Sequence, residues 1–387
     1  MFNIQTLNKI SKYGTDNFDK AKYNVADDVQ NPDAIMVRSA AMHDMEFAPN
    51  LLAIARAGAG VNNIPVDKCA EMGICVFNTP GANANAVKEL VIAGLLLSSR
   101  KIPDAMAWAQ TLKGNGAEVG KMVEKGKSQF AGPEIMGKTL GVIGLGAIGV
   151  LVANAAVALG MKVVGYDPYL SVKTALGLNP AVKVVSDVKD LYGASDYVTI
   201  HVPYNADTKG TINADAIASM KDGVRILNFA RGELADNAAV ISALESGKVS
   251  AYVVDFPSDE VLGIKGVIAI PHLGASTPES EDNCAMMAAL ELIDYIENGN
   301  IKNSVNYPNA EMTAAGTKVC IMHKNIPDVL SKLTAIFGSA GINIGNMVNA
   351  SKKDYAYTMI DAGGDVNDDM IKKLAAVESV IKVRVIK

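Results

Sequence analysis

The sequence predicts an α/β protein with two lobes and a small C-terminal domain. From residue 139 onward, short apolar strand patterns alternate with helical patterns, which is typical of a doubly wound parallel sheet. Residues 1–97 hold further apolar runs between turn-rich segments, which indicate a second α/β unit. Residues 317–387 follow the order βαββαβ, which predicts a ferredoxin-like domain. A chain of 387 residues is too long for one ordinary core, so several domains are expected.

The first lobe is expected to contain strands at 34–37, 51–55 and 74–77. Residues 85–98 form an apolar helical pattern, and the polar segment 100–137 is expected to be helix and loop leading to the next domain. We therefore assign residues to four parts: 1–97 with 278–305 as the first domain, 98–277 as the second, 306–316 as a linker and 317–387 as the third.

The second lobe shows the clearest alternation of strand and helix. Helices are expected at 147–159 and 236–246, and a long helix at 278–299 is expected to return the chain to the first domain. The strands are expected at 139–143, 162–166, 182–185, 196–201, 224–229, 250–255 and 267–270.

The C-terminal domain has strands and helices in a different order. Helices are expected at 327–340 and 368–376. The strands are expected at 318–323, 343–350, 356–361 and 380–385.

A glycine-rich motif follows the strand that begins at residue 139. Gly144 permits the tight turn, Gly146 lets the backbone approach a pyrophosphate, and Gly149 lets the helix pack closely on the strand. Asp167 follows at the spacing of the acid that binds ribose hydroxyls, and its charge favours NAD over NADP. The pyrophosphate is expected at the helix N-terminus, beside the backbone of Ala147 and Ile148.

Composition excludes several other classes of protein. The apolar run 141–161 is long enough to span a bilayer, but its glycines and the lack of an aromatic belt favour a buried βα unit. A net charge of −5 and no basic tract argue against nucleic-acid binding. The start of the chain lacks the apolar core of a signal peptide, and four cysteines show no zinc-ligand spacing. We expect a cytoplasmic protein with free thiols and no metal.

The four histidines can each be assigned a role. His43 lies beside an aspartate in a loop and is expected on the surface, and His323 belongs to the C-terminal domain. His201 ends a strand, and it can either line a cofactor cleft or only cap the strand. His272 follows a strand and opens a turn before a helix, at the sheet edge where ligands bind, so it is the candidate base.

Two charged residues follow neighbouring strands and can assist such a base. Arg231 can grip a carboxylate and polarise a carbonyl. Glu260 precedes the last strand and can orient the imidazole of His272. These three side chains are the candidate catalytic residues.

Over nearly its whole length, the chain resembles the D-isomer-specific 2-hydroxyacid dehydrogenases. The resemblance rests on motifs at 56–64, 78–90, 144–149, 201–210, 228–236, 253–260 and 271–280. It implies a flavodoxin-like substrate domain, a Rossmann domain for NAD and the catalytic triad Arg231, Glu260 and His272. Asp255 would lie beside the nicotinamide. The remaining cofactor contacts would come from His201, Val202, Pro203, Thr208, Ala230, His272 and Gly274.

One departure concerns the acid of the triad. The family usually has Asp-Val-Phe-x-x-Glu, whereas this chain reads DFPSDE from Asp255 to Glu260. The spacing to Glu260 is kept, but Asp259 is an alternative partner for His272.

The resemblance also implies the substrate contacts. Backbone N–H groups of Ala57, Gly58, Ala59 and Gly60 would hold a carboxylate, and Arg38, Arg56, Arg231 and Asn78 would complete the site, with Asn85 near it. Arg38 and Arg56 can alternatively be structural ion pairs.

The C-terminal domain resembles an ACT domain. In serine-inhibited relatives its effector contacts would correspond to His323, Asn325 and Asn343. The usual loop Asn-x-Pro-Gly ends here in Asp328, so either the loop or the effector has changed, and a dimerisation module without ligand is the alternative.

The resemblance, together with the C-terminal domain, implies oxidation of D-3-phosphoglycerate, in the first step of phosphorylated serine biosynthesis. A different D-2-hydroxy acid, such as 2-hydroxyglutarate, and a non-catalytic sensor of NAD and amino acids are the alternatives. A homodimer or homotetramer is expected, through the apolar helix 85–98 or the edge strands of the small sheet.

Overall fold

The computed structural model describes residues 1–386, apart from the side chain of Lys173. It contains two parallel sheets and one small antiparallel sheet, which confirms the α/β prediction. The chain divides into two compact units, residues 1–82 with 278–387 and residues 83–277. No helix within residues 1–386 is both long and apolar enough to cross a membrane.

Unit 2 (83–277) is built on a seven-stranded parallel sheet in the order β12-β11-β10-β9-β6-β7-β8. Its strand order reverses at β6, as in a Rossmann fold. The strands are β6 (Thr139–Ile143), β7 (Lys162–Tyr166), β8 (Lys183–Val185), β9 (Tyr197–Ile200), β10 (Val224–Asn228), β11 (Val249–Val254) and β12 (Val267–Ala269). Every adjacent pair is parallel, so all their carboxyl ends meet at one edge of the sheet.

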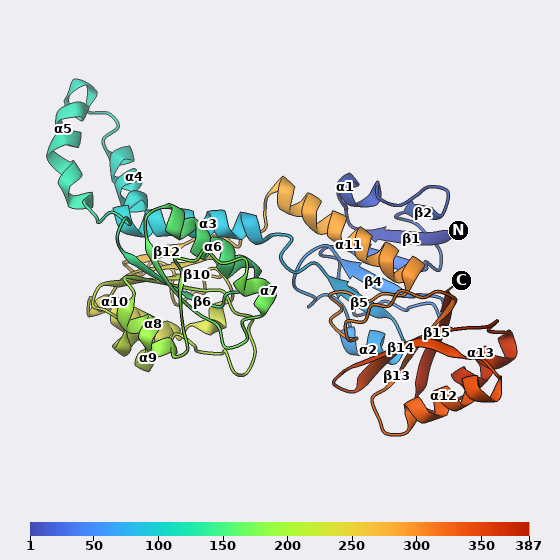
Figure 1. The fold of residues 1–387 in the computed structure, drawn as a ribbon. Helices are drawn as coiled ribbons and strands as arrows, with labels where there is room; N and C mark the ends of the chain where they lie inside the picture. Colours follow the sequence, from blue (N-terminus) through green and yellow to red (C-terminus); the bar gives the residue numbers. More distant parts are fainter. Residues whose placement is uncertain (387) are drawn as a thin grey trace. The chain divides into compact units, whose positions relative to one another are not determined.

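Helices cover this sheet because their apolar faces need burial. They are α6 (Ala147–Ala158), α7 (Val172–Ala175), α8 (Val188–Ala194), α9 (Ala214–Ser219) and α10 (Asn237–Glu245). Figure 1 also shows α4 (Ile102–Thr111) and α5 (Val119–Gly126) as an arm that extends from this unit. The rings of Trp108 and Phe130, 5.3 Å apart, pack at the base of the arm's return segment.

Helix α3 (Ala84–Arg100) belongs to unit 2, which differs from our expected boundary after residue 97. Its buried residues Val87, Val91 and Leu95 lie in one core cluster with Val152 of α6 and Phe229. At Gly94 a side chain would meet the ring of Phe229 at 2.8 Å, so the helix lies close to the sheet. Hydrophobic packing therefore attaches residues 83–97 to the second unit, a contact that local sequence patterns do not report.

Unit 1 (1–82 and 278–387) has a five-stranded parallel sheet in the order β2-β1-β3-β4-β5, the flavodoxin-like arrangement. The strands are β1 (Phe2–Leu7), β2 (Tyr23–Ala26), β3 (Ala34–Val37), β4 (Ala53–Arg56) and β5 (Cys75–Asn78). The helices are α1 (Lys12–Thr15), α2 (Val66–Glu71) and α11 (Pro278–Asn298), which returns the chain to this unit as predicted. β1 and β2 were not predicted, and only Ile4 and Tyr23 are buried in these two strands.

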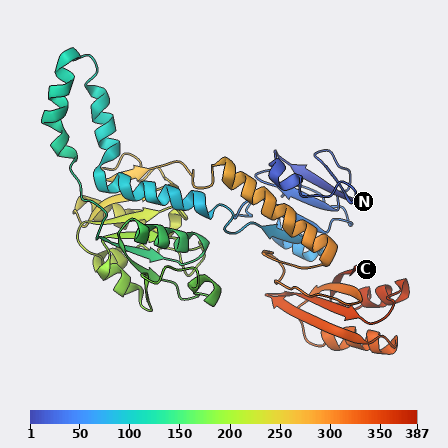
Figure 2. The same ribbon diagram turned by 45° about the horizontal axis from the view of Figure 1, so that its top comes forward.

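The C-terminal domain is part of unit 1 and has the predicted order βαββαβ. Its elements are β13 (Thr317–Lys324), α12 (Val329–Ser339), β14 (Ile344–Lys352), β15 (Tyr355–Ala362), α13 (Asp368–Ala375) and β16 (Val380–Ile386). The antiparallel sheet has the order β14-β15-β13-β16, that of a ferredoxin-like fold. Figure 2 shows both helices on one side of this sheet.

The other face of this small sheet packs on the rest of unit 1. Met322 and Tyr357 share a buried core with Phe77 and Tyr295. Arg384 of β16 donates hydrogen bonds to the carbonyl oxygens of Tyr295 and Ile296, near the C-terminus of α11. A guanidinium is favourable there because the last carbonyls of a helix carry partial negative charge. The C-terminal domain and the α11 region are therefore joined by a common core.

Candidate active site

The glycine motif forms the turn between β6 and α6. Gly144 has a φ of 88°, and a side chain there would meet the carbonyl oxygen of His201 at 2.7 Å. Gly149 lies so close to the Gly144 carbonyl oxygen that a Cβ would approach it to 1.9 Å. At Gly146 nothing lies within 4 Å of a built Cβ, so this side of the turn is open. The close contacts at Gly144 and Gly149 therefore require glycine in this turn, and Gly146 leaves space for a ligand.

Asp167 lies directly beside this turn. Its carboxylate accepts hydrogen bonds from the backbone N–H of Leu145 at 2.9 Å and of Tyr169 at 2.8 Å. Two backbone donors fix the carboxylate at the end of β7. It stands next to the start of α6, where Ala147 and Ile148 are the first helical residues.

His201 lies at the point where the strand order reverses, between β9 and β6. Its backbone N–H donates to the carbonyl oxygen of Ile143 at 2.7 Å, and its Nε2 lies 3.0 Å from Thr199 Oγ1. Burial lowers the pKa of His201 to about 4, so the imidazole is neutral at pH 7. The loop that follows, with Val202 and Pro203, is closed by a hydrogen bond from Thr208 Oγ1 to the Pro203 carbonyl.

A buried asparagine shapes the turn after β10. Asn228 Nδ2 donates to the carbonyl oxygen of Arg231 at 2.8 Å, and its Oδ1 accepts from the N–H of Ala230 at 3.2 Å. Arg231 is exposed, and its guanidinium donates to the Ala230 carbonyl at 2.7 Å. Asn228 was not predicted as a site residue, although it stands in the motif that contains Arg231.

Asp255 is 1% exposed at the end of β11, and its Oδ1 has no hydrogen-bond partner. Burial raises the pKa of its carboxyl group to about 6, and the nearby charge of Arg231 opposes this shift. A Cβ on Gly274 would lie 3.7 Å from Asp255 Oδ2, so the turn after His272 passes beside this carboxyl group. An orphaned buried acceptor at this edge is suited to a ligand that donates a hydrogen bond.

The raised pKa of Asp255 predicts a pH-dependent stability. The folded protein binds this proton more tightly than the unfolded chain, so the free energy of unfolding falls as pH rises from about 4 through 6 and stays lower above. In Asp255→Asn this part of the pH dependence, up to about 2 kcal/mol, should disappear. Urea unfolding of the NAD-free protein at pH 4.5 and pH 8 measures it. Equal pH dependence in both proteins would contradict the assignment.

One aromatic ring contacts both His272 and Arg231. The ring of Phe256 lies 4.2 Å from the His272 ring, and the Arg231 guanidinium carbon lies 5.1 Å from the centre of the same ring. Phe256 stands where the family usually has valine, so this departure places an aromatic platform between the base and the cation. Arg231 and His272 both follow strands at the carboxyl edge of the sheet, and His272 is exposed within its unit.

Glu260 is oriented by an asparagine at the start of α10. Asn237 Nδ2 donates to Glu260 Oε2 at 2.8 Å and to Ser258 Oγ at 3.2 Å. Asn237 was not predicted as a site residue, because its position relative to Glu260 depends on the sheet. The pairing of Glu260, or of Asp259, with His272 stays a prediction.

The residues expected to bind substrate lie at the carboxyl edge of the sheet of unit 1. Arg38 forms an ion pair with Glu281 of α11 at 2.7 Å, and Arg56 Nε donates to the Arg38 carbonyl at 3.1 Å. The turn 57–60 is anchored by N–H donation from Ala57 to the Val37 carbonyl. Asn78 Nδ2 donates to the carbonyl of Ala59, so it supports this turn.

The three expected effector residues do not meet within one chain. His323 is buried, with ring nitrogens 2.8 Å from Thr358 Oγ1 and 2.8 Å from the Lys324 carbonyl oxygen. Asn325, two residues after His323, donates through Nδ2 to the Lys353 carbonyl oxygen. Asn343 precedes β14 at the opposite end of the sheet, about 20 Å away along the strands. A site formed by all three would need a second copy of the chain.

Asp328 adopts the backbone conformation that glycine would favour. Its φ is 68°, a left-handed value that aspartate tolerates better than most side chains. Its carboxylate lies 3.3 Å from Lys332 and also accepts from Ser331, and these contacts lower the pKa of the carboxyl group. The loop thus has the left-handed turn that glycine allows and adds a charge to it.

Comparison with known proteins agrees with this geometry. Residues 92–274 match the family described as D-isomer specific 2-hydroxyacid dehydrogenase, NAD binding domain. The chain is 33% identical over 355 residues to D-3-phosphoglycerate dehydrogenase of Haemophilus influenzae, covering 88% of this chain and 83% of that protein. The chain belongs to the D-isomer-specific 2-hydroxyacid dehydrogenases.

Other members of the family match over different lengths. The chain is 38% identical over 294 residues to D-3-phosphoglycerate dehydrogenase of Archaeoglobus fulgidus, covering 73% of this chain and 53% of that protein. It therefore spans about half the length of this relative. NAD-bound 3-phosphoglycerate dehydrogenase of Entamoeba histolytica superposes with a TM-score of 0.60 at 25% identity, covering 80% of this chain and 99% of that one. D-mandelate dehydrogenase of Rhodotorula graminis shares the fold, with a TM-score of 0.67 at 24% identity and 78% and 97% coverage.

NAD is the cofactor of this family member, and unit 2 fits it. The open face of Gly146, the carboxylate of Asp167 and the unpartnered Oδ1 of Asp255 lie along one edge of the sheet. They suit a pyrophosphate, a ribose diol and a carboxamide N–H respectively.

Proposed function

We propose that the protein oxidises D-3-phosphoglycerate to 3-phosphohydroxypyruvate with NAD, the first step of phosphorylated L-serine biosynthesis. The match to 83% of the length of the Haemophilus influenzae enzyme carries this proposal. The placement of Arg231, Asp255 and His272 after consecutive strands of unit 2 supports it.

In the proposed mechanism, His272 removes the proton of the C2 hydroxyl. NAD, when bound, would supply the acceptor for the hydride that leaves C2. Arg231 holds the carboxylate and the C2 oxygen, and Glu260, oriented by Asn237, stabilises the imidazolium that forms. The N–H groups of residues 57–60, with Arg38, Arg56 and Asn78, bind the remainder of the substrate, and cofactor contacts come from the residues of unit 2 named above.

A phosphate-free 2-hydroxy acid, such as 2-hydroxyglutarate, is the second candidate substrate. The ion pair between Arg38 and Glu281 supports this second candidate, because Arg38 already has an anionic partner other than a substrate phosphate. NADH formation with 3-phosphoglycerate, glycerate and 2-hydroxyglutarate separates the two. We expect the highest kcat/KM for 3-phosphoglycerate. A higher value for an unphosphorylated acid would overturn the proposed substrate, and no NADH from any acid despite NAD binding would favour a non-catalytic sensor.

We also propose four functional parts. Residues 1–97 with 278–305, without helix α3, would bind the substrate, and helix α3 with the residues that follow it up to 277 would bind NAD. Residues 306–316 would be a linker, and residues 317–387 an ACT domain. The protein would act in the cytoplasm, where its buried free thiols stay reduced.

A homodimer through the NAD-binding units, or a homotetramer through the ACT domains, is the proposed assembly. The buried face of α3 is already covered by α6, so the arm, with Met106 64% exposed, is the better candidate surface. Serine inhibition through His323, Asn325 and Asn343 would require the tetramer.

A further inference from the structure

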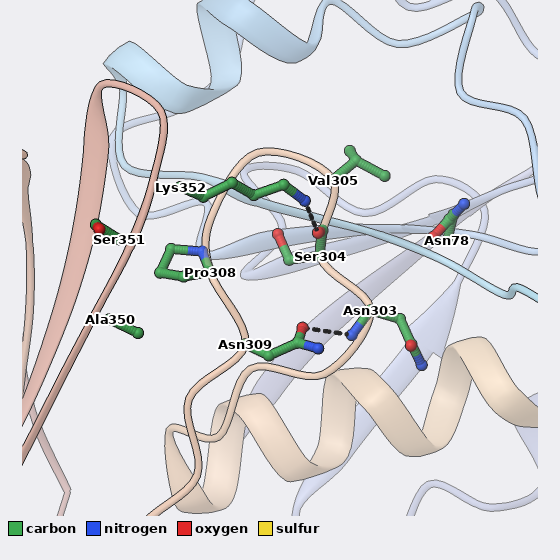
Figure 3. A pocket seen from close by; sticks show the side chains of 9 residues that line it. All are labelled: Asn78, Asn303, Ser304, Val305, Pro308, Asn309, Ala350, Ser351 and Lys352. Carbon is green, nitrogen blue, oxygen red and sulfur yellow. Dashed lines mark hydrogen bonds between the residues drawn. The ribbon is translucent and has the colours of Figure 1, made fainter. Parts of the chain in front are cut away.

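A polar pocket of about 530 Å³ lies in unit 1, where the C-terminal domain meets the segment before it (Figure 3). One wall is the end of β14, with Ser351 and Lys352. The other is formed by the segment 303–309 and by Asn78 at the end of β5. Two parts of the chain that belong to different predicted domains therefore build one pocket.

The pocket carries a positive charge. Lys352 Nζ donates to the carbonyl oxygen of Ser304 at 2.8 Å, as Figure 3 shows. None of the nine described residues that line the pocket is acidic. Partial burial lowers the pKa of Lys352, so its charge is incompletely solvated. An anion in the pocket would compensate this charge.

The other polar groups of the wall can complete an anion site. Asn309 Oδ1 accepts from the backbone N–H of Asn303 at 3.0 Å, so its amide nitrogen is the end left to donate. One ammonium group together with an amide donor is a suitable set for a small oxyanion.

The pocket wall is bonded to the expected substrate turn. Asn78 donates through its backbone N–H to the Asn303 carbonyl at 3.4 Å and through its side chain to the Ala59 carbonyl. Asn303 Nδ2 donates to the buried Glu291 at 2.8 Å, which holds this asparagine at a left-handed φ of 57°. Asn78 therefore connects Asn303 to the turn 57–60 by two hydrogen bonds.

We propose that this pocket binds a small oxyanion, a carboxylate or a phosphate, through Lys352, and that its occupancy changes substrate binding at residues 57–60. The effect on substrate binding rests on the proposed function. The site is separate from His323, Asn325 and Asn343, none of which lines it.

Calorimetric titration of the NAD-free full chain with malonate, and separately with inorganic phosphate, tests whether the pocket binds an anion. Lys352→Met should weaken binding of the preferred anion at least about tenfold, since a charged hydrogen-bond partner is lost. Lys353→Met, one residue further on the same hairpin and outside the lining, is the matched control and should bind as the wild type does. The anion that binds identifies the carboxylate or the phosphate.

A second variant keeps the test valid if Lys352→Met is unstable. Asn309→Asp retains the acceptor for the Asn303 N–H but adds a negative charge, so it should also weaken anion binding at least about tenfold. Repeating the titrations in Arg231→Met should weaken anion binding at the candidate active site and leave the pocket's binding intact. Equal affinity in Lys352→Met and Lys353→Met, or no binding of either anion, would overturn the site.

Enzyme kinetics test whether occupancy of the pocket changes substrate binding. Saturating the pocket with the preferred anion should change KM for the hydroxy acid in Lys353→Met but not in Lys352→Met. Binding without any change in KM would overturn the coupling to residues 57–60. If no hydroxy acid is oxidised, the proposed function fails, while the titrations still decide whether the anion site exists.

Discussion

His272→Ala should lower kcat at least about 100-fold, with the affinity for NAD almost unchanged. The imidazole is the proposed acceptor of the C2 hydroxyl proton, and without it that proton has only water as acceptor. NADH formation under saturating substrate measures kcat, and fluorescence titration measures NAD binding. The ring contact with Phe256 places this side chain beside Arg231, so alanine also removes packing within the site.

The matched control is His43→Ala. His43 is exposed in unit 1, and its Nε2 lies 2.9 Å from the carbonyl oxygen of Asn62. This variant loses the same side chain outside the proposed chemistry, so its kcat should equal that of the wild type. Near-normal turnover of His272→Ala would exclude it as the base.

Gly149→Ala should destabilise unit 2 by about 3 kcal/mol, seen as a fall in Tm of about 5–10 °C. The new Cβ would lie 1.9 Å from the Gly144 carbonyl oxygen, which no van der Waals contact permits. Relief would require α6 to move away from β6, and this movement would also distort the turn that faces the cofactor. Differential scanning calorimetry of the NAD-free protein measures the change.

Gly146→Ala separates the effect on the fold from the effect on the cofactor. Its Cβ meets nothing within 4 Å in the protein, so the Tm without NAD should change little. The same methyl group occupies the space left for the pyrophosphate, so NAD affinity should fall. A large loss of Tm in Gly146→Ala, or none in Gly149→Ala, would contradict this division of roles.

Strands that are buried on both faces were predictable from the sequence. β6 and β7 have the expected bounds because continuous apolar runs bordered by glycine and turn residues report burial directly. β1 and β2 were missed because their side chains are mostly half-buried or exposed, so polar residues interrupt the pattern.

The site was predictable in part for the same reason. Carboxyl ends of parallel strands meet at one edge, so Gly144, Asp167 and Arg231 could be grouped from the order of strands alone. Asn237 and Phe256 could not, because their contacts with Glu260 and His272 join residues on different loops.

The sequence by itself determined the buried strands of unit 2 and the sheet edge expected to carry the chemistry, because turns, hydrophobic period and strand order are local properties. Tertiary structure alone decided that helix α3 packs in unit 2 and that the effector residues lie at opposite ends of a sheet. It also decided that Lys352 meets Ser304 in a shared pocket. These outcomes depend on packing between segments far apart in the chain, and residue order carries no direct record of that packing.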